Sequence, residues 1–185
     1  MSDVKKILFI VGSLRNQSFN RKLAKEMELR LLNRAEVEWL DFADVPFLDQ
    51  DIEYPAPESI DRIRKAVRQA DGIWIFTPEY NYQIPGYLKN LLDWLSRPME
   101  ENNWKLGSAV RGKPVTVSGV AGKSAAAGAR KQLSNLLNIM GMKVIDGEGT
   151  GIALSPGSFH TGLLAISPLD KAALEEQVEV FLAAL

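Results

Sequence analysis

The stretch KKILFIVGSLRNQSFN, residues 5–20, sets the architecture predicted for this chain. Its apolar run at residues 7–11 is rich in β-branched and aromatic side chains, which is typical of a strand buried on both faces. A polar loop follows the run, and beyond it apolar residues recur at helical spacing as Leu23, Met27 and Leu31. A strand, a loop and a helix in this order indicate the first half of a βαβ unit.

The alternation of strand and helix continues to the end of the chain. Further strands are predicted at residues 37–42, 72–77, 114–118 and 142–145. Apolar stripes at helical spacing lie at residues 60–70, 88–95, 133–140 and 174–182. Because parallel strands joined by helices cross over with a right hand, we expect a doubly wound α/β domain with five parallel strands. Two segments give no regular pattern, residues 43–57 and residues 147–169.

Length and composition favour a single domain over residues 1–185 that folds by itself. The 23 acidic residues nearly cancel the 22 basic ones, so no net charge attracts nucleic acid or an anionic membrane surface. No apolar run is long enough to span a bilayer and no targeting signal is evident, so we expect a cytoplasmic protein. The chain has no cysteine, and any redox chemistry therefore requires a bound cofactor.

The loop after the first strand is suited to an anion. Ligands of doubly wound sheets bind beyond the carboxyl ends of the strands, and a helix N-terminus there favours a phosphate. Residues 4–25 contain six Lys or Arg and no acidic residue, and Ser13, Arg15, Ser18 and Asn20 can add donors. Without the second and third glycines of G-x-G-x-x-G, the loop favours a monophosphate over a dinucleotide. The same residues also fit a simpler interpretation, in which Ser18 and Asn20 only cap the helix and Arg15 is solvated.

The loop after the third strand, residues 77–86, is suited to a flat ring. It carries two prolines, which stiffen it, and two tyrosines, Tyr80 and Tyr82, which offer aromatic surface. An ordinary strand-to-helix turn with both tyrosines packed locally is the alternative. After the fourth strand, Gly122-Lys123-Ser124 does not complete a nucleotide-hydrolase loop, because Val117 stands where that motif requires glycine.

These loops together resemble one known family. Gly12-Ser13-Leu14-Arg15 with Ser18 and Asn20, then Pro78-Glu79-Tyr80-Asn81, Pro85-Gly86-Tyr87-Leu88-Lys89-Asn90 and Asp93-Trp94 with Ser96-Arg97, are similar to the motifs of the NADPH-dependent FMN reductase family. Within it the chain most resembles bacterial quinone and chromate reductases. The resemblance covers roughly residues 5–145 and implies a flavodoxin-like three-layer fold, with strand order 2-1-3-4-5 and helices on both faces.

The resemblance also implies which residues bind the cofactor FMN. The phosphate would be held by Ser13, Arg15, Ser18, Phe19 and Asn20. The isoalloxazine ring would be bordered by Pro78, Glu79, Tyr80 and Asn81, with Ser118 and Gly119 near its pyrimidine side. The pair Tyr82-Gln83 departs from the small residues more usual there, which would narrow the acceptor pocket.

The implied activity is hydride transfer from NADPH or NADH, through bound FMN, to a small-molecule electron acceptor by a ping-pong mechanism. Quinones are the expected acceptors, with chromate, azo compounds or free flavin as further candidates. No side chain is predicted to be catalytic, because the flavin carries the chemistry. The alternative is a flavodoxin-type electron carrier without NAD(P)H turnover, although such carriers are strongly acidic. A nucleotide-handling enzyme is disfavoured by Val117.

Some residues are expected to be structural. His160 is the only histidine and has no ligand cluster beside it, so no metal site is predicted. Asp93, Trp94 and Arg97 are expected to pair and pack, and Trp104 to pack locally or on a partner subunit. The family resemblance implies a homodimer or homotetramer, and neither nucleic acid nor membrane is an expected partner.

Overall fold

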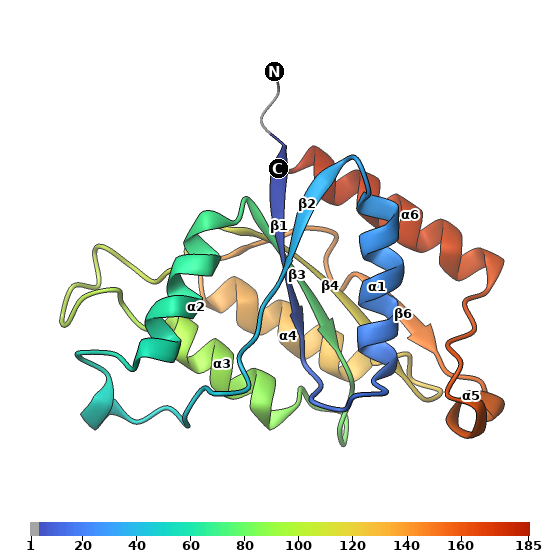
Figure 1. Cartoon of the computed structure of the whole chain (residues 1–185), viewed down its shortest axis with the longest axis horizontal. Helices are drawn as coiled ribbons and strands as arrows, with labels where there is room; N and C mark the ends of the chain where they lie inside the picture. The colour runs from blue at the N-terminus through green and yellow to red at the C-terminus, as the bar shows by residue number, and fades with distance from the viewer. Residues whose placement is uncertain (1–3) are drawn as a thin grey trace.

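The computed structural model describes residues 4–185 and has three layers, a central sheet between two layers of helices (Figure 1). The strands are β1 (Lys5–Val11), β2 (Ala35–Trp39), β3 (Gly72–Thr77), β4 (Pro114–Ala121), β5 (Lys143–Val144) and β6 (Thr150–Ala153). The helices are α1 (Phe19–Leu31), α2 (Glu58–Gln69), α3 (Gly86–Ser96), α4 (Ala127–Ile139), α5 (Pro156–Thr161) and α6 (Pro168–Ala183), with a short 3-10 helix η1 (Gln50–Ile52).

The sheet is parallel throughout, in the order β2-β1-β3-β4-β5. This confirms the predicted doubly wound, flavodoxin-like fold. β3 has the predicted bounds, because its whole length is buried and its ends are marked by Asp71 and Pro78. β2 begins and ends earlier than residues 37–42, and the chain beyond it runs irregularly to α2 apart from η1.

The strand count is a correction, because the described part of the chain has six strands and not five. The edge strand next to β4 is interrupted: β5 pairs with the start of β4, and β6 pairs with its last four residues. Between them Asp146, Gly147 and Gly149 all have positive φ. A Cβ on Gly149 would lie 1.8 Å from the carbonyl oxygen of Val117, so this turn crosses β4 too closely for a side chain.

The two faces of the sheet bury separate cores. In β1, Leu8 and Ile10 pack into one core with α2, α3 and α4, while Ile7, Phe9 and Val11 pack into the other with α1 and α6. All five side chains are buried, which is the reason for the continuous apolar run seen in the sequence.

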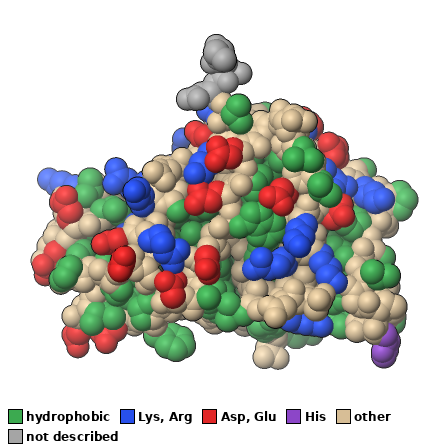
Figure 2. All heavy atoms as spheres, viewed as in Figure 1, with side chains coloured by type: hydrophobic (Ala, Val, Ile, Leu, Met, Phe, Trp, Pro, Cys, Tyr) green, Lys and Arg blue, Asp and Glu red, His purple; other side chains and the backbone are tan. Residues whose placement is uncertain are grey.

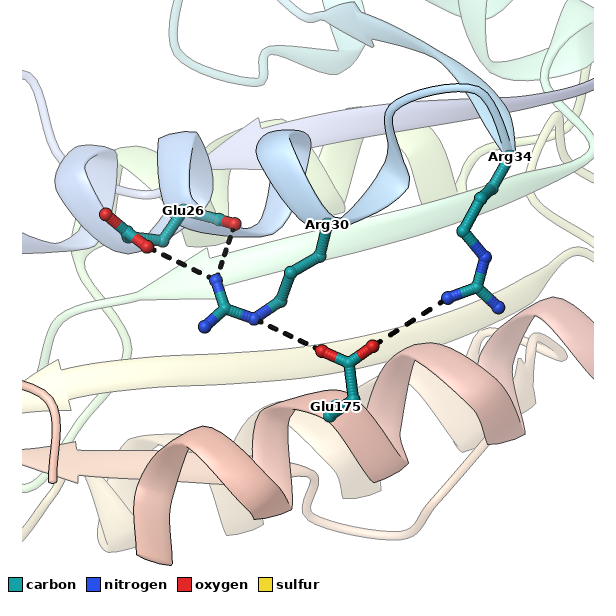
Figure 3. Close-up of polar contacts among 4 residues, drawn as sticks. All are labelled: Glu26, Arg30, Arg34 and Glu175. Atoms are coloured by element: carbon teal, nitrogen blue, oxygen red, sulfur yellow. Dashed lines mark hydrogen bonds and ion pairs between the residues drawn. The ribbon is translucent and has the colours of Figure 1, made fainter. Parts of the chain in front are cut away.

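Ion pairs join the two helices of the second face (Figure 3). On α1, Arg30 bonds Glu26 one turn earlier at 3.2 Å and reaches Glu175 of α6 at 3.5 Å. Arg34, in the turn after α1, approaches the same carboxylate at 3.9 Å. These contacts are partly exposed and each contributes little stability, so the buried core between α1 and α6 holds them together.

Candidate functional site

The carboxyl ends of β1, β3 and β4 lie at one edge of the sheet, toward the bottom of Figure 1. The loops after these strands enclose a cavity of about 190 Å³. Its lining consists of Ser13, Arg15, Ser18, Phe19, Asn20, Pro78, Glu79, Tyr80, Val120, Ala121, Gly122, Leu154 and Phe159. The structure therefore brings together eight residues singled out in the sequence, from two loops that are about 60 positions apart.

The loop after β1 ends at the N-terminus of α1. The Gly12 N–H donates to the Phe76 carbonyl of β3 at 2.8 Å, and a Cβ on Gly12 would lie 2.9 Å from Leu88. Ser18 is the N-cap of α1, its hydroxyl accepting from the Arg21 N–H at 3.3 Å, and the first turn has no acidic residue. The positive end of the α1 dipole thus faces the cavity without a neutralising carboxylate in its first turn.

Asn20 joins this loop to β4. Its side-chain amide donates to the Val120 carbonyl at 3.0 Å, and its side-chain oxygen accepts from the Val120 N–H at 2.9 Å. Both groups are buried. Asn20 therefore lines the cavity while its amide holds β4 beside the start of α1, a positioning role that the sequence could not distinguish from ligand binding.

A wall of the cavity comes from a segment the sequence did not predict. Phe159 of α5 contacts Phe19 edge-on, with ring centroids 6.0 Å apart. The same Phe19 ring has the Arg15 guanidinium 5.9 Å away and the Lys22 ammonium 5.6 Å away, and Lys22 donates to the Gly162 carbonyl just after α5. Two cations therefore lie beside the cavity where α5 packs on α1.

Glu79 connects the loop after β3 to α4. Its carboxylate accepts from the Ser124 hydroxyl at 2.5 Å and from the Ala129 N–H at 2.9 Å. Ala126, the N-cap of α4, offers no side-chain cap, so Glu79 fills that role from another loop. Burial alone would raise the pKa of Glu79, but these hydrogen bonds and the charge of Arg130 outweigh it and lower the pKa below its ordinary value.

Of the seven non-glycine residues with positive φ in the described part of the chain, four lie in the loops after β3 and β4. Asn81 and Tyr82 have φ of 53° and 64° in a tight turn closed by reciprocal bonds between Tyr80 and Gln83, each 3.0 Å. Ala125 and Ala126, in the loop after β4, have φ of 49° and 57°. Non-glycine residues in this region are uncommon, and they cluster where the surrounding structure holds a functional geometry.

Three of the predicted site residues do not line this cavity. Asn81 lies on a neighbouring cavity of about 310 Å³, which shares Glu79 with the first. Ser118 is buried within β4 and bonds Gln177 of α6 at 2.9 Å and the Trp74 indole at 3.0 Å. Gly119 is also within β4, and a Cβ there would lie 2.9 Å from the Thr77 carbonyl oxygen.

The end of β4 is a correction with a clear cause, while the predicted place of Ser118 and Gly119 beside the pyrimidine side of the ring stays a prediction. β4 extends to Ala121, three residues past the predicted end, because β6 pairs with its carboxyl half. The cavity is therefore lined by the last two residues of β4, Val120 and Ala121, and by Gly122, which follows the strand. The glycine and alanines of this loop were the available signal in the sequence, but nothing in it marked Leu154 or Phe159.

A further cavity of about 380 Å³ lies on the β2 side and shares Ser13 with the first. Arg21, Trp39 and Tyr87 line it, and the Arg21 guanidinium lies 5.6 Å from the Trp39 ring. Burial, with the charges of two nearby aspartates, raises the pKa of Tyr87 to about 12, so its hydroxyl stays protonated. Two cavities adjoining the central one thus give the site further room.

The residues that were predicted to be structural lie in structural positions. Trp94 is buried and its indole donates to the Pro46 carbonyl at 2.9 Å, while Asp93 pairs with Lys89 at 2.5 Å. His160 is exposed on α5. Within residues 4–185, no group of three His, Cys, Asp or Glu side chains is placed to hold a metal ion. Among the helices of that same part, none is long and apolar enough to cross a membrane.

Comparison with known proteins gives consistent matches. The family model described as NADPH-dependent FMN reductase matches residues 5–153. A quinone reductase of Pseudomonas putida strain KT2440 is 37% identical over 122 residues, which are 65% of this chain and 62% of that enzyme. An NAD(P)H-dependent FMN reductase of Pseudomonas aeruginosa is 29% identical over 97% of this chain and 94% of its own length.

Among solved structures, FerB of Paracoccus denitrificans, a flavoenzyme NAD(P)H:(acceptor) oxidoreductase, has a TM-score of 0.83 at 30% identity. That likeness covers 97% of this chain and 96% of FerB, whereas the match to the P. putida enzyme spans about three fifths of its length. The family match includes every residue predicted for the site and ends before α5.

Proposed function

The chain belongs to the NADPH-dependent FMN reductase family, and from this premise we propose that it binds FMN and passes reducing equivalents from NAD(P)H to quinones or similar small acceptors. The observation that carries the proposal is the single cavity where the loops after β1 and β3 bring eight predicted site residues together. The relatives' names, quinone reductase and NAD(P)H-dependent FMN reductase, support the same substrates.

The donors at the α1 end of the cavity fit a phosphate. Ser13, Arg15 and Ser18 line it together, and the first turn of α1 adds backbone N–H groups with no competing carboxylate. A phosphate monoester carries up to two negative charges, and Arg15 and Lys22 supply the matching positive ones. We propose that these residues hold the FMN phosphate.

The opposite end fits a flat, polar-edged ring. Pro78, Glu79 and Tyr80 form one wall, and Val120 to Gly122 form another. Glu79 keeps these walls at a fixed separation by bonding the start of α4. The chemistry supplied by a bound flavin is uptake of a hydride from NAD(P)H and delivery of two electrons to the acceptor, which permits a ping-pong order on one open face.

The alternative, a flavodoxin-type carrier, is less well supported. The formal net charge of −1 offers no strongly acidic surface for docking a redox protein. The neighbouring cavities of about 310 and 380 Å³ lie within the size range of small-molecule sites. Room beside the ring favours an enzyme that binds NAD(P)H and then an acceptor.

The direct test is anaerobic mixing of FMN-loaded protein with NADPH, followed by benzoquinone. We expect the absorbance at roughly 450 nm, where oxidised flavins absorb, to fall and then return. A protein that takes up no FMN overturns the proposal. Bound flavin that NADPH leaves oxidised would instead support the carrier.

Two further properties concern the cellular location and the oligomeric state. The cytoplasmic location stays a prediction from the sequence. We also propose that the chain works as a homo-oligomer, a homodimer or a homotetramer.

A further inference from the structure

The cavity of about 380 Å³ on the β2 side, which we call the β2 cavity, has no role in the proposed FMN site. It is lined by residues that follow β1, by Arg21 of α1, by residues 39–43 and by Tyr87, and it shares only Ser13 with the central cavity. In Figure 2, basic side chains gather beside apolar ones over the region between β2 and α1. A second ligand, or a second part of one ligand, can therefore bind beside the phosphate end of the central cavity.

Aromatic side chains form walls of the β2 cavity. Tyr87 and Phe42 stack with their ring centroids 4.2 Å apart and an angle of 16° between their planes. The Trp39 ring has the Arg21 guanidinium 5.6 Å from its centroid, and its Nε1 donates to Glu28 at 2.8 Å. These contacts fix the rings, so a flat heterocycle would bind against aromatic surface that is already ordered.

Two opposite charges that line the β2 cavity have no ionic partner. Among residues 4–185, neither the Arg21 guanidinium nor the Asp41 carboxylate forms an ion pair. The Asp41 carboxylate accepts from the Ala43 N–H at 3.2 Å. The neighbouring Arg62 pairs instead with Asp44 at 2.7 Å. A positive and a negative group are therefore both free to bind a ligand in this cavity.

The Tyr87 hydroxyl lies within the electrostatic reach of both charges. Burial, followed by the negative charges of Asp41 and Asp44, raises the pKa of Tyr87 to about 12. The positive charge of Arg21 acts on the same hydroxyl in the opposite direction. The hydroxyl stays protonated at neutral pH and can donate a hydrogen bond. A cation, a carboxylate and a neutral donor thus converge on one cavity with aromatic walls.

This combination matches the adenosine and diphosphate part of a pyridine dinucleotide. A purine is flat and stacks on aromatic rings, ribose hydroxyls donate to a carboxylate, and a diphosphate pairs with a guanidinium. The topology offers an analogy, because in dinucleotide-binding α/β sheets a carboxylate about 20 residues beyond the first loop binds a ribose hydroxyl. Asp41 has a similar place relative to the loop at residues 12–20.

We propose that the β2 cavity binds the adenosine end of the reducing dinucleotide, with Arg21 at the diphosphate and Asp41 at the ribose hydroxyls. This inference rests on the proposed NAD(P)H-dependent function and adds a binding site to it. The lining has one cation and one carboxylate. NADPH carries a further phosphate on its ribose, which Asp41 would repel and for which the lining has no second cation. The chain therefore prefers NADH to NADPH, unlike the description of its family.

The binding test uses ADP-ribose, which contains the adenosine and the diphosphate but no nicotinamide. Calorimetric titration of the FMN-loaded protein should show one site, with affinity about tenfold lower in Arg21→Gln and in Asp41→Asn. Lys25→Gln removes the same charge as Arg21→Gln one turn further along α1, outside the β2 cavity, and should change nothing. All three side chains are exposed and none lines the central cavity, so folding and flavin content are spared.

Anaerobic reduction of the bound flavin supplies a second readout. Its dependence on dinucleotide concentration gives a dissociation constant and a limiting rate constant for NADH and for NADPH. We expect NADH to bind about tenfold more tightly at a similar limiting rate, because the adenosine end does not touch the reacting atoms. Arg21→Gln should weaken NADH binding about tenfold and leave the limiting rate unchanged. Asp41→Asn should remove most of the preference for NADH, because a neutral amide does not repel the extra phosphate.

The outcomes separate this site from the proposed function. A wild-type preference for NADPH, no binding of ADP-ribose, or binding that Arg21→Gln and Asp41→Asn leave unchanged would each overturn the inference, even if NADPH reduces the flavin. If the protein takes up no FMN, the proposed function is wrong, and the same titration of the flavin-free protein still decides whether the β2 cavity binds ADP-ribose.

Discussion

Replacing Glu79 tests whether one carboxylate holds the candidate site together. In Glu79→Ala, the Ala129 N–H and the Ser124 hydroxyl both lose their acceptor. Loss of a helix cap costs about 1 kcal/mol, loss of negative charge at a helix start about 0.5 kcal/mol, and loss of the second hydrogen bond about 1 kcal/mol. We therefore expect the free energy of unfolding to fall by about 2–3 kcal/mol, and FMN affinity to fall roughly tenfold because the two walls of the cavity are no longer joined.

Glu79→Gln is the matched control for this prediction. Its amide oxygen can still accept from Ala129, and its amide nitrogen can donate to the Ser124 hydroxyl, which accepts as well as donates. Only the charge is lost, so we expect a cost of about 0.5–1 kcal/mol. Urea unfolding of the flavin-free proteins at pH 7 gives the stabilities, and titration with FMN gives the affinities. The reasoning is refuted if Glu79→Ala is as stable as wild type, or if Glu79→Gln is as damaging as Glu79→Ala.

Three further predictions follow from the same geometry. Arg15→Ala should weaken FMN binding by about 1–3 kcal/mol at matched salt, through loss of a charge-assisted bond to the phosphate; equal retention of flavin by the mutant would show that Arg15 is only a solvated side chain. The pKa of Glu53 and of Glu79 lies below the ordinary value of 4.5, so their stabilising contribution is complete above that pH and is lost as the pH falls through the folded pKa; acid titration of unfolding should show a smaller loss of stability in Glu79→Gln, which has no carboxylate to protonate there, and a loss as large as in the wild type would contradict it. Gly149→Ala should destabilise by more than about 1 kcal/mol, because its Cβ would meet a β4 carbonyl oxygen at 1.8 Å and its φ is +62°, whereas Gly86→Ala has open space and should be neutral; similar thermal midpoints for the two variants would argue against the close crossing.

Local patterns were enough to predict most of the fold. Residues 72–77 are β3 as predicted, because every side chain in it is apolar or small and buried on both faces. The loops after β1 and β3 were recognised because their polar, proline and tyrosine residues follow directly on apolar runs. Both signals depend on neighbours in the sequence, so the sequence alone contains them.

Long-range pairing decided what was missed. β4 was predicted to end at Ser118, but β6 pairs with it as far as Ala121, and the Ser118 hydroxyl donates to Gln177 of α6. Phe159 reaches the cavity only because α5 packs on α1. These contacts join residues about 30 to 140 positions apart, and no local periodicity reports them.

Arg64 shows the same limit of prediction from local sequence patterns. It lies in the apolar stripe of α2, between Ile63 and Val67, so its burial agrees with helical periodicity. That its Nε and Nη2 atoms have no hydrogen-bond partner within the described residues is visible only once Glu53 and Arg97 are placed together.

The sequence by itself determined the order of strands and helices, the anion-favouring loop after β1 and the proline- and tyrosine-bearing loop after β3, because hydrophobic periodicity and turn chemistry act between near neighbours. Only the tertiary structure decided which side chains face the cavity and which instead hold its walls together, as Asn20 and Glu79 do. The physical reason is that burial and hydrogen-bond satisfaction depend on packing among segments distant in the chain.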